Sequence, residues 1–527
     1  SHKYNRSMKK IILLSAIILS SIYAFGQEDI ELTGGQECTS IMAGKKATVD
    51  GSVITSHTCD GVSHNWISIE PAADHKKGEV QKIYYGTRWT YFRDDTTGVR
   101  LKGEIPQAPH TYAYINTGYP SLNEKQLAIG ESTFTGPKEL INKDAMFMVE
   151  ELARVALQRC TTARDAVLLM GSLAEKYGYA DGGEILTVAD KNEVWDFEIV
   201  GCGKDKIGAL WVAKKVPDDH IAIVANIPRI GKIEKNNPNF LSSNPKTIEK
   251  VAKEYKCWDG KGEFLWWKAF NASYAKGKNY SVREWFVMNT LAPSLSLTMD
   301  MSELPFSIKP ERKIDVRDVM ALLRSTYEDT QYDMTKGIVV NVPAKDTVPA
   351  HKKVSPVANP WLTASTRDML NTIAPGTVEF QRTLAVAWCS YSTVIQLRNW
   401  LPDAVGGICW WGADNPGESP RIPIFAGATL LPSAFDYCGQ KKYNTESVTW
   451  KFRRANRLAT VAWQTSKDKV NESIAKIEKL GFEGLPALEA NPTTDALNAY
   501  TAKIYEAAVA EWQSLEEFFW MKYGRGF

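Results

Sequence analysis

Apolar residues follow two periodicities along most of the chain, which predicts a mixture of β-strands and α-helices. Short runs rich in β-branched and aromatic residues, bounded by turn residues, predict strands. These runs cover residues 38–44, 52–56, 66–70, 110–115, 127–130, 185–189, 194–200 and 221–225. Apolar residues that recur every three or four positions predict helices over 145–160 and 162–177. Clustered strands followed by paired helices indicate a layered α+β domain in which helices cover antiparallel sheets.

The C-terminal part of the chain has helical periodicity alone. It covers residues 446–480 and 494–523, and the Asn-Pro-Thr-Thr sequence at 491–494 supplies a helix start between them. The regularly spaced apolar residues of the second stretch are Leu497, Tyr500, Ile504, Ala508, Trp512, Leu515 and Phe519. We expect an antiparallel helical hairpin that packs on the rest of the chain.

The N-terminal residues have the pattern of a segment that is removed. Met8-Lys-Lys10 precedes an apolar run over 11–24, and Ala24-Phe-Gly26 supplies small residues where a signal peptidase would cut. The run is too short for a comfortable membrane span, so we expect no stable membrane insertion and a periplasmic or secreted protein. The expected division is 1–26 as leader and signal peptide, the polar stretch 27–37 as propeptide, 38–440 as the main domain and 441–527 as the helical segment.

Charge and cysteine content narrow the class of partner. The chain has 63 Lys and Arg against 61 Asp and Glu, a net charge of +2, so no strong field favours nucleic acid or an anionic membrane. Eight cysteines in 527 residues are too sparse for a disulfide scaffold. None lies in a Cys-x-x-Cys pair or at zinc spacing with His. We expect a small ligand, no cofactor and no metal, and the oligomeric state stays open, with a homo-oligomer among the options.

Cys38 follows the polar leader and opens the first predicted strand. A lone cysteine is usually buried and inert, so the surrounding sequence decides. The stretch reads Cys38-Thr-Ser-Ile-Met-Ala-Gly-Lys-Lys-Ala-Thr-Val-Asp-Gly-Ser52 and continues with Thr55-Ser-His-Thr-Cys-Asp60. It resembles the opening of the cysteine dipeptidases typified by bacterial dipeptidase A and the secernins. These proteins share the N-terminal-nucleophile fold with penicillin V acylase and bile salt hydrolase.

The resemblance extends from residue 38 to about residue 430. Segments in matching order are 123–133, 182–195, 216–230, 396–402 and 406–410. The resemblance implies a four-layer αββα N-terminal-nucleophile hydrolase fold, removal of the residues before Cys38, and hydrolysis of short peptides through a thioester on the Cys38 thiol. The implied base is the α-amino group of the same residue, whose ordinary pKa of about 7.7 to 8.0 suits proton exchange near neutrality. Whether the cut before Cys38 is autocatalytic stays open.

The resemblance also implies roles for residues near the nucleophile in sequence. Asp60 would hold charge on the new ammonium or on the amine of the substrate, and the alternative is a turn residue in Asp60-Gly61. His57 stands where many relatives carry Arg. Either a partly charged imidazole replaces a fixed positive charge there, or the position is structural.

The tetrahedral intermediates of acyl transfer need donors aimed at the developing charge, and the resemblance implies that the side-chain amides of Asn226 and Asn123 are these oxyanion donors. Both sit beside turn-prone sequence, so loop capping is the alternative for each. Glu184 and Arg229 are expected to contact the substrate or to be structural. The guanidinium fork of Arg229 suits a peptide carboxylate.

Two alternatives to a dipeptidase follow from the same residues. An acylase of a conjugated amide, such as a bile-salt or lactam side-chain amide, would use the same chemistry. A processed but non-catalytic binding protein would fit the loss of Arg at His57. Other enzyme classes lack support, because the chain has no Walker loop, no His-Glu-x-x-His and no Gly-x-Gly-x-x-Gly after a strand.

Overall fold

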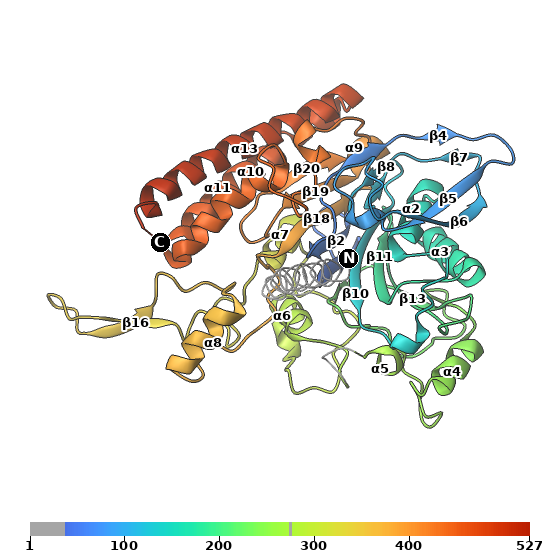
Figure 1. The fold of residues 1–527 in the computed structure, drawn as a ribbon, viewed down its shortest axis with the longest axis horizontal. Helices are drawn as coiled ribbons and strands as arrows, with labels where there is room; N and C mark the ends of the chain where they lie inside the picture. The colour runs from blue at the N-terminus through green and yellow to red at the C-terminus, as the bar shows by residue number, and fades with distance from the viewer. Residues whose placement is uncertain (1–36, 273–276, 527) are drawn as a thin grey trace, which may run out of the picture.

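Two antiparallel sheets form the centre of the molecule (Figure 1). The computed structural model describes residues 37–272 and 277–526, so the expected leader, signal peptide and nearly all of the expected propeptide lie outside the described residues. The six-stranded sheet has the order β14-β1-β2-β18-β19-β20 and the eight-stranded sheet β15-β13-β12-β11-β10-β9-β8-β3. The strands of the first are β14 (Ile221–Val224), β1 (Cys38–Ala43), β2 (Val53–Asp60), β18 (Cys389–Leu397), β19 (Ile408–Ala413) and β20 (Ile422–Phe425).

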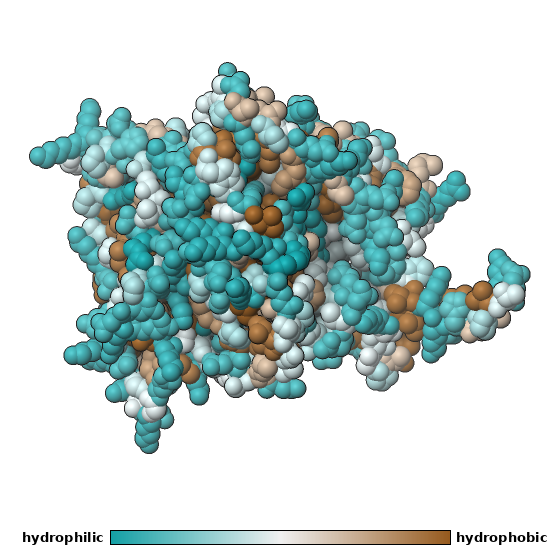
Figure 2. Space-filling model, turned by 180° about the vertical axis from the view of Figure 1, so that it is seen from behind, coloured by the Kyte–Doolittle hydropathy of each residue, from teal (hydrophilic) through white to brown (hydrophobic). Residues whose placement is uncertain are grey.

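The other sheets of the described residues are the eight-stranded sheet and three outlying two-stranded sheets. The sheet contains β15 (Phe240–Ser242), β13 (Leu210–Lys215), β12 (Val194–Val200), β11 (Gly183–Ala189), β10 (Ala128–Phe134), β9 (Leu122–Asn123), β8 (Tyr114–Asn116) and β3 (Ser68–Glu70). The other pairs are β4 (Ala73–Asp74) with β7 (His110–Thr111), β5 (Val80–Tyr85) with β6 (Arg100–Pro106), and β16 (Val339–Val342) with β17 (His351–Val354). The β16–β17 hairpin extends from the body in Figures 1 and 2.

The two sheets lie face to face, and small polar side chains join them. Ser40 on β1 and Thr55 on β2 each hydrogen-bond to the Thr187 hydroxyl of β11 at 2.7 Å. A Cβ at Gly130 of β10 would lie 2.2 Å from the Ser56 carbonyl oxygen, so this close approach requires glycine. The short distance between the sheets lets side chains of β1, β2 and β10 meet in one buried space.

Helices cover the outer face of each sheet (Figure 1). α2 (Val149–Arg159) and α3 (Ala163–Tyr177) pack against the eight-stranded sheet. α6 (Val282–Leu291) and α7 (Val316–Leu323) share a hydrophobic core with Ile41 and Ile54 of the six-stranded sheet. The other helices of the described residues, apart from the α-helices of the C-terminal region, are α4 (Pro245–Glu254), α5 (Trp266–Phe270), α8 (Ala364–Ile373), α9 (Asp403–Gly406), η1 (Thr87–Trp89), η2 (Lys138–Leu140), η3 (Pro293–Leu295), η4 (Ser433–Asp436) and η5 (Thr460–Ala462).

The C-terminal region is helical, as predicted, but the first half of the expected helical hairpin, over 446–480, consists of more than one helix. The helices are α10 (Val448–Ala459), α11 (Trp463–Glu483), α12 (Leu485–Ala490) and α13 (Thr494–Tyr523). The single helix expected over 446–480 is wrong, because the backbone of Ala462 has φ −144° and ψ 70°, outside the helical region. The second arm is confirmed as α13, whose apolar face is buried against α10, α11 and β20 except for the partly exposed Tyr500.

Most predicted strands are present with shifted ends, and the exceptions have physical causes. The strand expected over 110–115 is divided into β7 and β8, because the Tyr112 and Ala113 N–H groups bond to Gln158 and Glu124 instead of a neighbouring strand. β18 and β19 were not predicted. Every residue of both is buried, and Cys, Ser and Gly interrupt their β-branched and aromatic residues, so neither stands out as a continuous strand-forming run.

Hydrophilic side chains cover most of the face seen in Figure 2, and apolar residues form small separate patches on it. Within the described residues, no helix combines the length and the apolar character that crossing a membrane requires.

Candidate active site

Cys38 begins β1 and lies at the centre of a buried polar cluster. In the antiparallel ladder of β1 and β2 it stands opposite Cys59. Its thiol hydrogen-bonds with Cys59 and His57, and the residue is 3% exposed. The Cys38 sulfur, a His57 ring nitrogen and a Glu131 oxygen lie within 4.8 Å of one another. Because Glu131 belongs to β10, this cluster spans the space between the two sheets.

His57 and Glu131 form an ion pair beside the thiol. His57 Nε2 lies 2.9 Å from Glu131 Oε2, and both side chains are buried. Burial alone would lower the pKa of His57, but its hydrogen bonds to Cys38 and Glu131 raise that pKa to about 9. Burial alone would raise the pKa of Glu131, but hydrogen bonds and the charge of His57 lower it to about 2. The imidazole is therefore positively charged near neutral pH.

The Cys38 thiol is protonated in this environment. Burial raises the pKa of Cys38 well above its usual range, and His57 acts in the opposite direction. A thiolate formed here would be stabilised by the adjacent imidazolium. The His57 charge thus favours the nucleophilic form of the Cys38 sulfur.

Two tyrosines hold the His57 ring between them. The Tyr119 and Tyr391 rings meet it edge-on, with ring centroids 5.2 and 5.7 Å from that of His57. The Tyr391 hydroxyl accepts a hydrogen bond from the Tyr119 backbone N–H at 3.0 Å. The imidazole plane is fixed by packing as well as by Glu131.

Glu184 supports Glu131 from the neighbouring strand β11. The Thr133 hydroxyl lies 2.7 Å from Glu131 Oε1 and 2.9 Å from Glu184 Oε1. Burial, and then the charge of Glu131, raise the pKa of Glu184 well above its usual range. Glu184 is therefore neutral and buried next to the His57–Glu131 pair, where it lacks the charge that would bind a substrate ammonium.

Asn226 contacts the backbone nitrogen of Cys38. The Cys38 N–H donates to Asn226 Oδ1 at 3.1 Å, and Asn226 Nδ2 donates to the Thr133 carbonyl at 2.6 Å. The Asn226 backbone has φ 62°, a left-handed conformation that asparagine tolerates, and its N–H donates to Ser132 Oγ at 2.8 Å. Both polar atoms of the amide are thus directed at the start of β1 and the end of β10.

Asp60 is buried at the end of β2 and forms an ion pair with Arg382. Arg382 comes from the connection between α8 and β18, and its Nε also donates to Glu37 at 2.8 Å. Burial raises the pKa of Asp60 to about 7 although Arg382 lowers it, and the nearby Glu37 raises it further. Asp60, Arg382 and Glu37 form a charged group next to the peptide bond that precedes Cys38.

Arg283 on α6 holds the backbone on the other side of Cys38. Its Nη1 donates to the Cys38 carbonyl at 3.1 Å and to Thr39 Oγ1 at 3.0 Å, and its Nη2 donates to the Ala225 carbonyl at 3.3 Å. Arg283 Nη2 also lies 3.5 Å from Glu37 Oε2. This fully buried guanidinium therefore fixes the position of the Cys38 main chain.

Asn123 is not part of this cluster. Its Nδ2 donates to the carbonyls of Leu157 and Cys160 at 2.8 and 2.9 Å. Its Oδ1 accepts from the N–H groups of Lys125 and Leu127 at 3.0 and 2.9 Å. These bonds use the whole hydrogen-bonding capacity of the amide. They give Asn123 the loop-capping contacts considered as its alternative, and we correct its assignment as an oxyanion donor accordingly.

Arg229 is also engaged away from Cys38. Its Nη1 donates to the Asn279 carbonyl and its Nη2 to the Pro305 carbonyl. Burial lowers its pKa. One arm of the fork holds the segment that leads into α6, and the other holds the segment between η3 and α7. Arg229 therefore makes structural contacts, and the structure does not bring it to a position where it would meet a peptide carboxylate.

The sequence reasoning missed Glu131, Arg283 and Arg382. Glu131 lies in the segment 123–133, which resembles the family. Its role depends on His57, which is 74 residues away, so no local pattern pairs the two. Arg283 lies between Ser281 and Glu284, which form a capping box. This pattern predicts the start of a helix but gives no sign that Arg283 contacts Cys38. Arg382 lies in an irregular connection and no local pattern marks it.

The Cys38, His57 and Glu131 side chains are the described group whose donor atoms have the types and spacing that would hold a metal ion. Each of the three already hydrogen-bonds to another member of the group. Their mutual pairing accounts for the arrangement without a metal.

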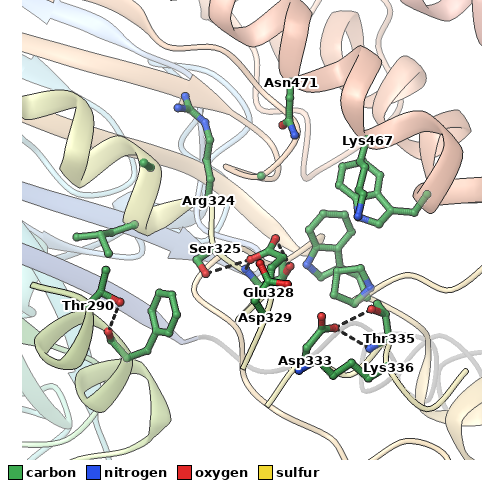
Figure 3. A pocket seen from close by; sticks show the side chains of 18 of the residues that line it. Thr290, Arg324, Ser325, Glu328, Asp329, Asp333, Thr335, Lys336, Lys467 and Asn471 are labelled. Atoms are coloured by element: carbon green, nitrogen blue, oxygen red, sulfur yellow. Dashed lines mark hydrogen bonds between the residues drawn. The ribbon is translucent and has the colours of Figure 1, made fainter. Parts of the chain in front are cut away.

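A cavity of 660 Å³ lies elsewhere, and Cys38 does not line it. It is bounded by α6, α7, α11 and the loop that follows α7. Figure 3 shows its polar side chains. Ser325 bonds to Glu328 at 3.3 Å and Thr335 bonds to Asp333 at 2.7 Å. The residues that line this cavity include no cysteine, so the candidate nucleophile is the thiol of the Cys38 cluster.

A thiol beside an imidazole that a carboxylate orients is the arrangement of a cysteine-dependent hydrolase. The chain belongs to peptidase family C69, whose family model matches residues 37–476. It is therefore a peptidase that acts on peptide substrates, and the resemblance found in the sequence is confirmed.

Three relatives illustrate the extent of the similarity. The chain is 29% identical over 406 residues to a probable dipeptidase of Latilactobacillus sakei, covering 74% of each chain. It is 23% identical over 469 residues to a probable dipeptidase A of Streptococcus pyogenes serotype M3, covering 86% of this chain and 89% of the relative. It is 24% identical over 491 residues to a probable dipeptidase B of Streptococcus pyogenes serotype M1, covering 88% and 86%.

Proposed function

We propose that this peptidase is a dipeptidase whose nucleophile is the Cys38 thiol at the N-terminus of a processed chain. The observation that carries the proposal is the contact of one residue, Cys38, with His57 through its thiol and with Asn226 through its backbone nitrogen. The relatives that are named probable dipeptidases support the substrate class. The family match begins at residue 37, next to the proposed nucleophile.

We also propose that the two facing sheets and their outer helices are the four-layer αββα fold of N-terminal-nucleophile hydrolases. The face-to-face contact through Thr187 and the helices on both outer faces support this proposal. The position of the nucleophile, at the first residue of an interior strand of the six-stranded sheet, also supports it.

Removal of the residues before Cys38 would create the catalytic base. Cleavage of the Glu37–Cys38 bond converts the Cys38 amide nitrogen into an α-amino group, and Asn226 Oδ1 already accepts a hydrogen bond from that nitrogen. Such an amine titrates near neutral pH and suits proton exchange with the thiol. Export to the periplasm or the exterior is part of the same proposal, on the basis of the N-terminal sequence pattern.

The proposed reaction proceeds through a thioester. The α-amine takes the proton of the Cys38 thiol, and the thiolate attacks the carbonyl carbon of the peptide bond. The C–N bond breaks as the amine returns its proton to the leaving nitrogen, which leaves the acyl group on Cys38. Water, activated by the same amine, then hydrolyses the thioester and restores the thiol.

The surrounding residues have distinct proposed roles in this reaction. His57, oriented by Glu131, stabilises the thiolate through its charge. Asn226 holds the α-amine and is the proposed oxyanion donor. Arg283 and Asp60 position the Cys38 main chain and the new ammonium.

A substrate panel tests the proposal. The mature protein and its Cys38→Ser variant are incubated with dipeptides and with glycine- and taurine-conjugated amides. We expect thiol-dependent cleavage of dipeptides and strong loss of turnover in Cys38→Ser, because a hydroxyl is far less acidic than a thiol. The matched control is Cys59→Ser, which changes the neighbouring thiol and should retain most turnover. Cleavage of the conjugated amides alone would identify an acylase, and no thiol-dependent turnover of either class would support a binding protein.

A further inference from the structure

Glu37 is the residue immediately before the proposed nucleophile, and its side chain is held by two arginines. Arg382 Nε donates to Glu37 Oε2 at 2.8 Å, and Arg283 Nη2 lies 3.5 Å from the same oxygen. The pKa of Glu37 is lowered, because the charges of Arg283 and Arg382 outweigh the effect of burial. The Glu37 carboxylate is therefore ionised and bound at a defined place beside Cys38.

This place corresponds to one position of a substrate. In the bond that precedes Cys38, Glu37 supplies the carbonyl carbon. In a dipeptide, the first residue supplies the carbonyl carbon that the Cys38 thiol attacks. Both carbonyl carbons must approach the same sulfur, so the side chain of a dipeptide's first residue is directed toward the region where the Glu37 side chain lies.

Removal of Glu37 makes this region more positive. Arg382 is 11% exposed and Arg283 is fully buried, and among the described residues Arg382 pairs with the carboxylates of Glu37 and Asp60. Loss of Glu37 removes one negative charge, and the cut adds a positive α-ammonium at Cys38. Arg382 keeps Asp60 but loses its contact with Glu37, so a carboxylate in the same place would regain a charge-assisted hydrogen bond and a cationic side chain would be repelled.

We propose that Arg382, assisted by Arg283, forms a subsite that selects peptides with Glu or Asp as the first residue. The inference rests on the proposed function, since it identifies the place of Glu37 with that of the substrate's first residue. The carboxylate of that residue takes the contacts that Glu37 makes before processing. Arg382 is a specificity residue in this scheme, because it contacts the substrate side chain and not the reacting atoms.

The test compares matched dipeptides on the mature protein, whose N-terminus is first checked by intact mass. Glu-Ala and Gln-Ala differ only in the charge at the first side chain, and Ala-Glu and Ala-Gln carry the same change at the second. We expect kcat/KM for Glu-Ala to exceed that for Gln-Ala by at least about tenfold, the size of effect expected for one charge-assisted contact. Ala-Glu and Ala-Gln should differ little.

Variants locate the effect at Arg382. In Arg382→Gln the ratio of kcat/KM for Glu-Ala over Gln-Ala should fall close to one, whatever the variant does to overall turnover through Asp60. The matched control is Arg367→Gln, which changes an arginine that bonds to the Leu362 carbonyl and stacks on Phe380, away from Glu37. The control should keep the wild-type ratio.

A measurement on the unaltered protein avoids dependence on the folding or processing of a variant. Free glutamate, the product that hydrolysis of the thioester releases from Glu-Ala, should inhibit hydrolysis of Gln-Ala more strongly than free glutamine does. A ratio near one for the unaltered protein, together with equal inhibition by glutamate and glutamine, would overturn the subsite while leaving the dipeptidase proposal intact. A preference that appears only for Ala-Glu would also overturn it, since Arg382 would then contact the leaving residue. Absence of any dipeptide turnover would overturn both proposals.

Discussion

His57 and Glu131 determine the charge next to the Cys38 sulfur. The family resemblance leads us to expect at this position an arginine, which is charged at every relevant pH. The imidazole is charged near neutral pH because its hydrogen bonds to Cys38 and to the buried Glu131 carboxylate, 2.9 Å away, raise its pKa. His57 can therefore place a positive charge beside the Cys38 sulfur as an arginine would.

The pH dependence of the melting temperature should show whether His57 is paired with Glu131. The ordinary pKa of His57 is 6.5 and burial with its partners brings it to about 9. A raised pKa contributes stability that is complete below about pH 6.5 and is lost as the pH rises through about 9. In Glu131→Gln the imidazole loses this partner, so the melting temperature of the variant should lie below that of the wild type by a gap that narrows between about pH 6.5 and 9.

The measurement is a series of thermal melts of both proteins across that range. Other groups whose titration changes the melting temperature do so equally in the wild type and in Glu131→Gln, so their effects cancel in the gap between the two proteins. A gap that stays constant or widens toward pH 9 would show that His57 is not charged through Glu131.

Asn226 gives a second prediction for a single residue. Asn226→Ala removes the acceptor of the Cys38 nitrogen and the proposed oxyanion donor, so kcat should fall by about a hundredfold to a thousandfold, with a smaller change in KM. Asn226→Asp should be worse, since it sets a carboxylate against the Thr133 carbonyl and the oxyanion. Steady-state kinetics on folded protein measure both values. A rise in KM alone would make Asn226 a substrate contact.

Among the elements, Asn123 joins the turn between β9 and β10 to the end of α2. Asn123→Ala would leave the Leu157 and Cys160 carbonyls and two backbone N–H groups without these partners, and unsatisfied buried groups cost about 1 to 3 kcal/mol. We expect a loss of unfolding free energy of about that size with turnover retained. Urea unfolding measures the loss of unfolding free energy, and kcat measured on the same preparation shows whether turnover is retained. Loss of turnover without loss of stability would return Asn123 to the catalytic group.

The elements that could be predicted from the sequence are those with local signals. α3 begins after Thr162, whose side chain accepts from the Asp165 N–H as a cap, and β12 coincides with the strand expected over 194–200. The strands β18 and β19 gave no such signal, because Cys, Ser and Gly interrupt their β-branched and aromatic residues. Cys38, Asp60 and Asn226 were found through the family resemblance, whereas their charged partners depend on contacts between distant segments.

At the scale of the whole molecule, the fold brings those distant segments to one point. Cys38 and His57 come from the six-stranded sheet, Glu131 comes from the eight-stranded sheet, and Arg283 comes from the helices that cover the first sheet. The facing sheets bury the cluster, which strengthens its electrostatic interactions. The same burial leaves Cys38 3% exposed in the chain that still carries Glu37, so processing is expected to open the site as well as to create its base.

The intact mass of the fully active enzyme tests the central claim most directly, because the account requires Cys38 to be the N-terminal residue. We predict a mass that corresponds to a chain beginning at Cys38, and alkylation of its thiol should abolish dipeptide turnover. A fully active enzyme that stably begins at Gln27, or at any other residue before Cys38, would contradict the account, since no α-amine would then be available beside the Cys38 sulfur.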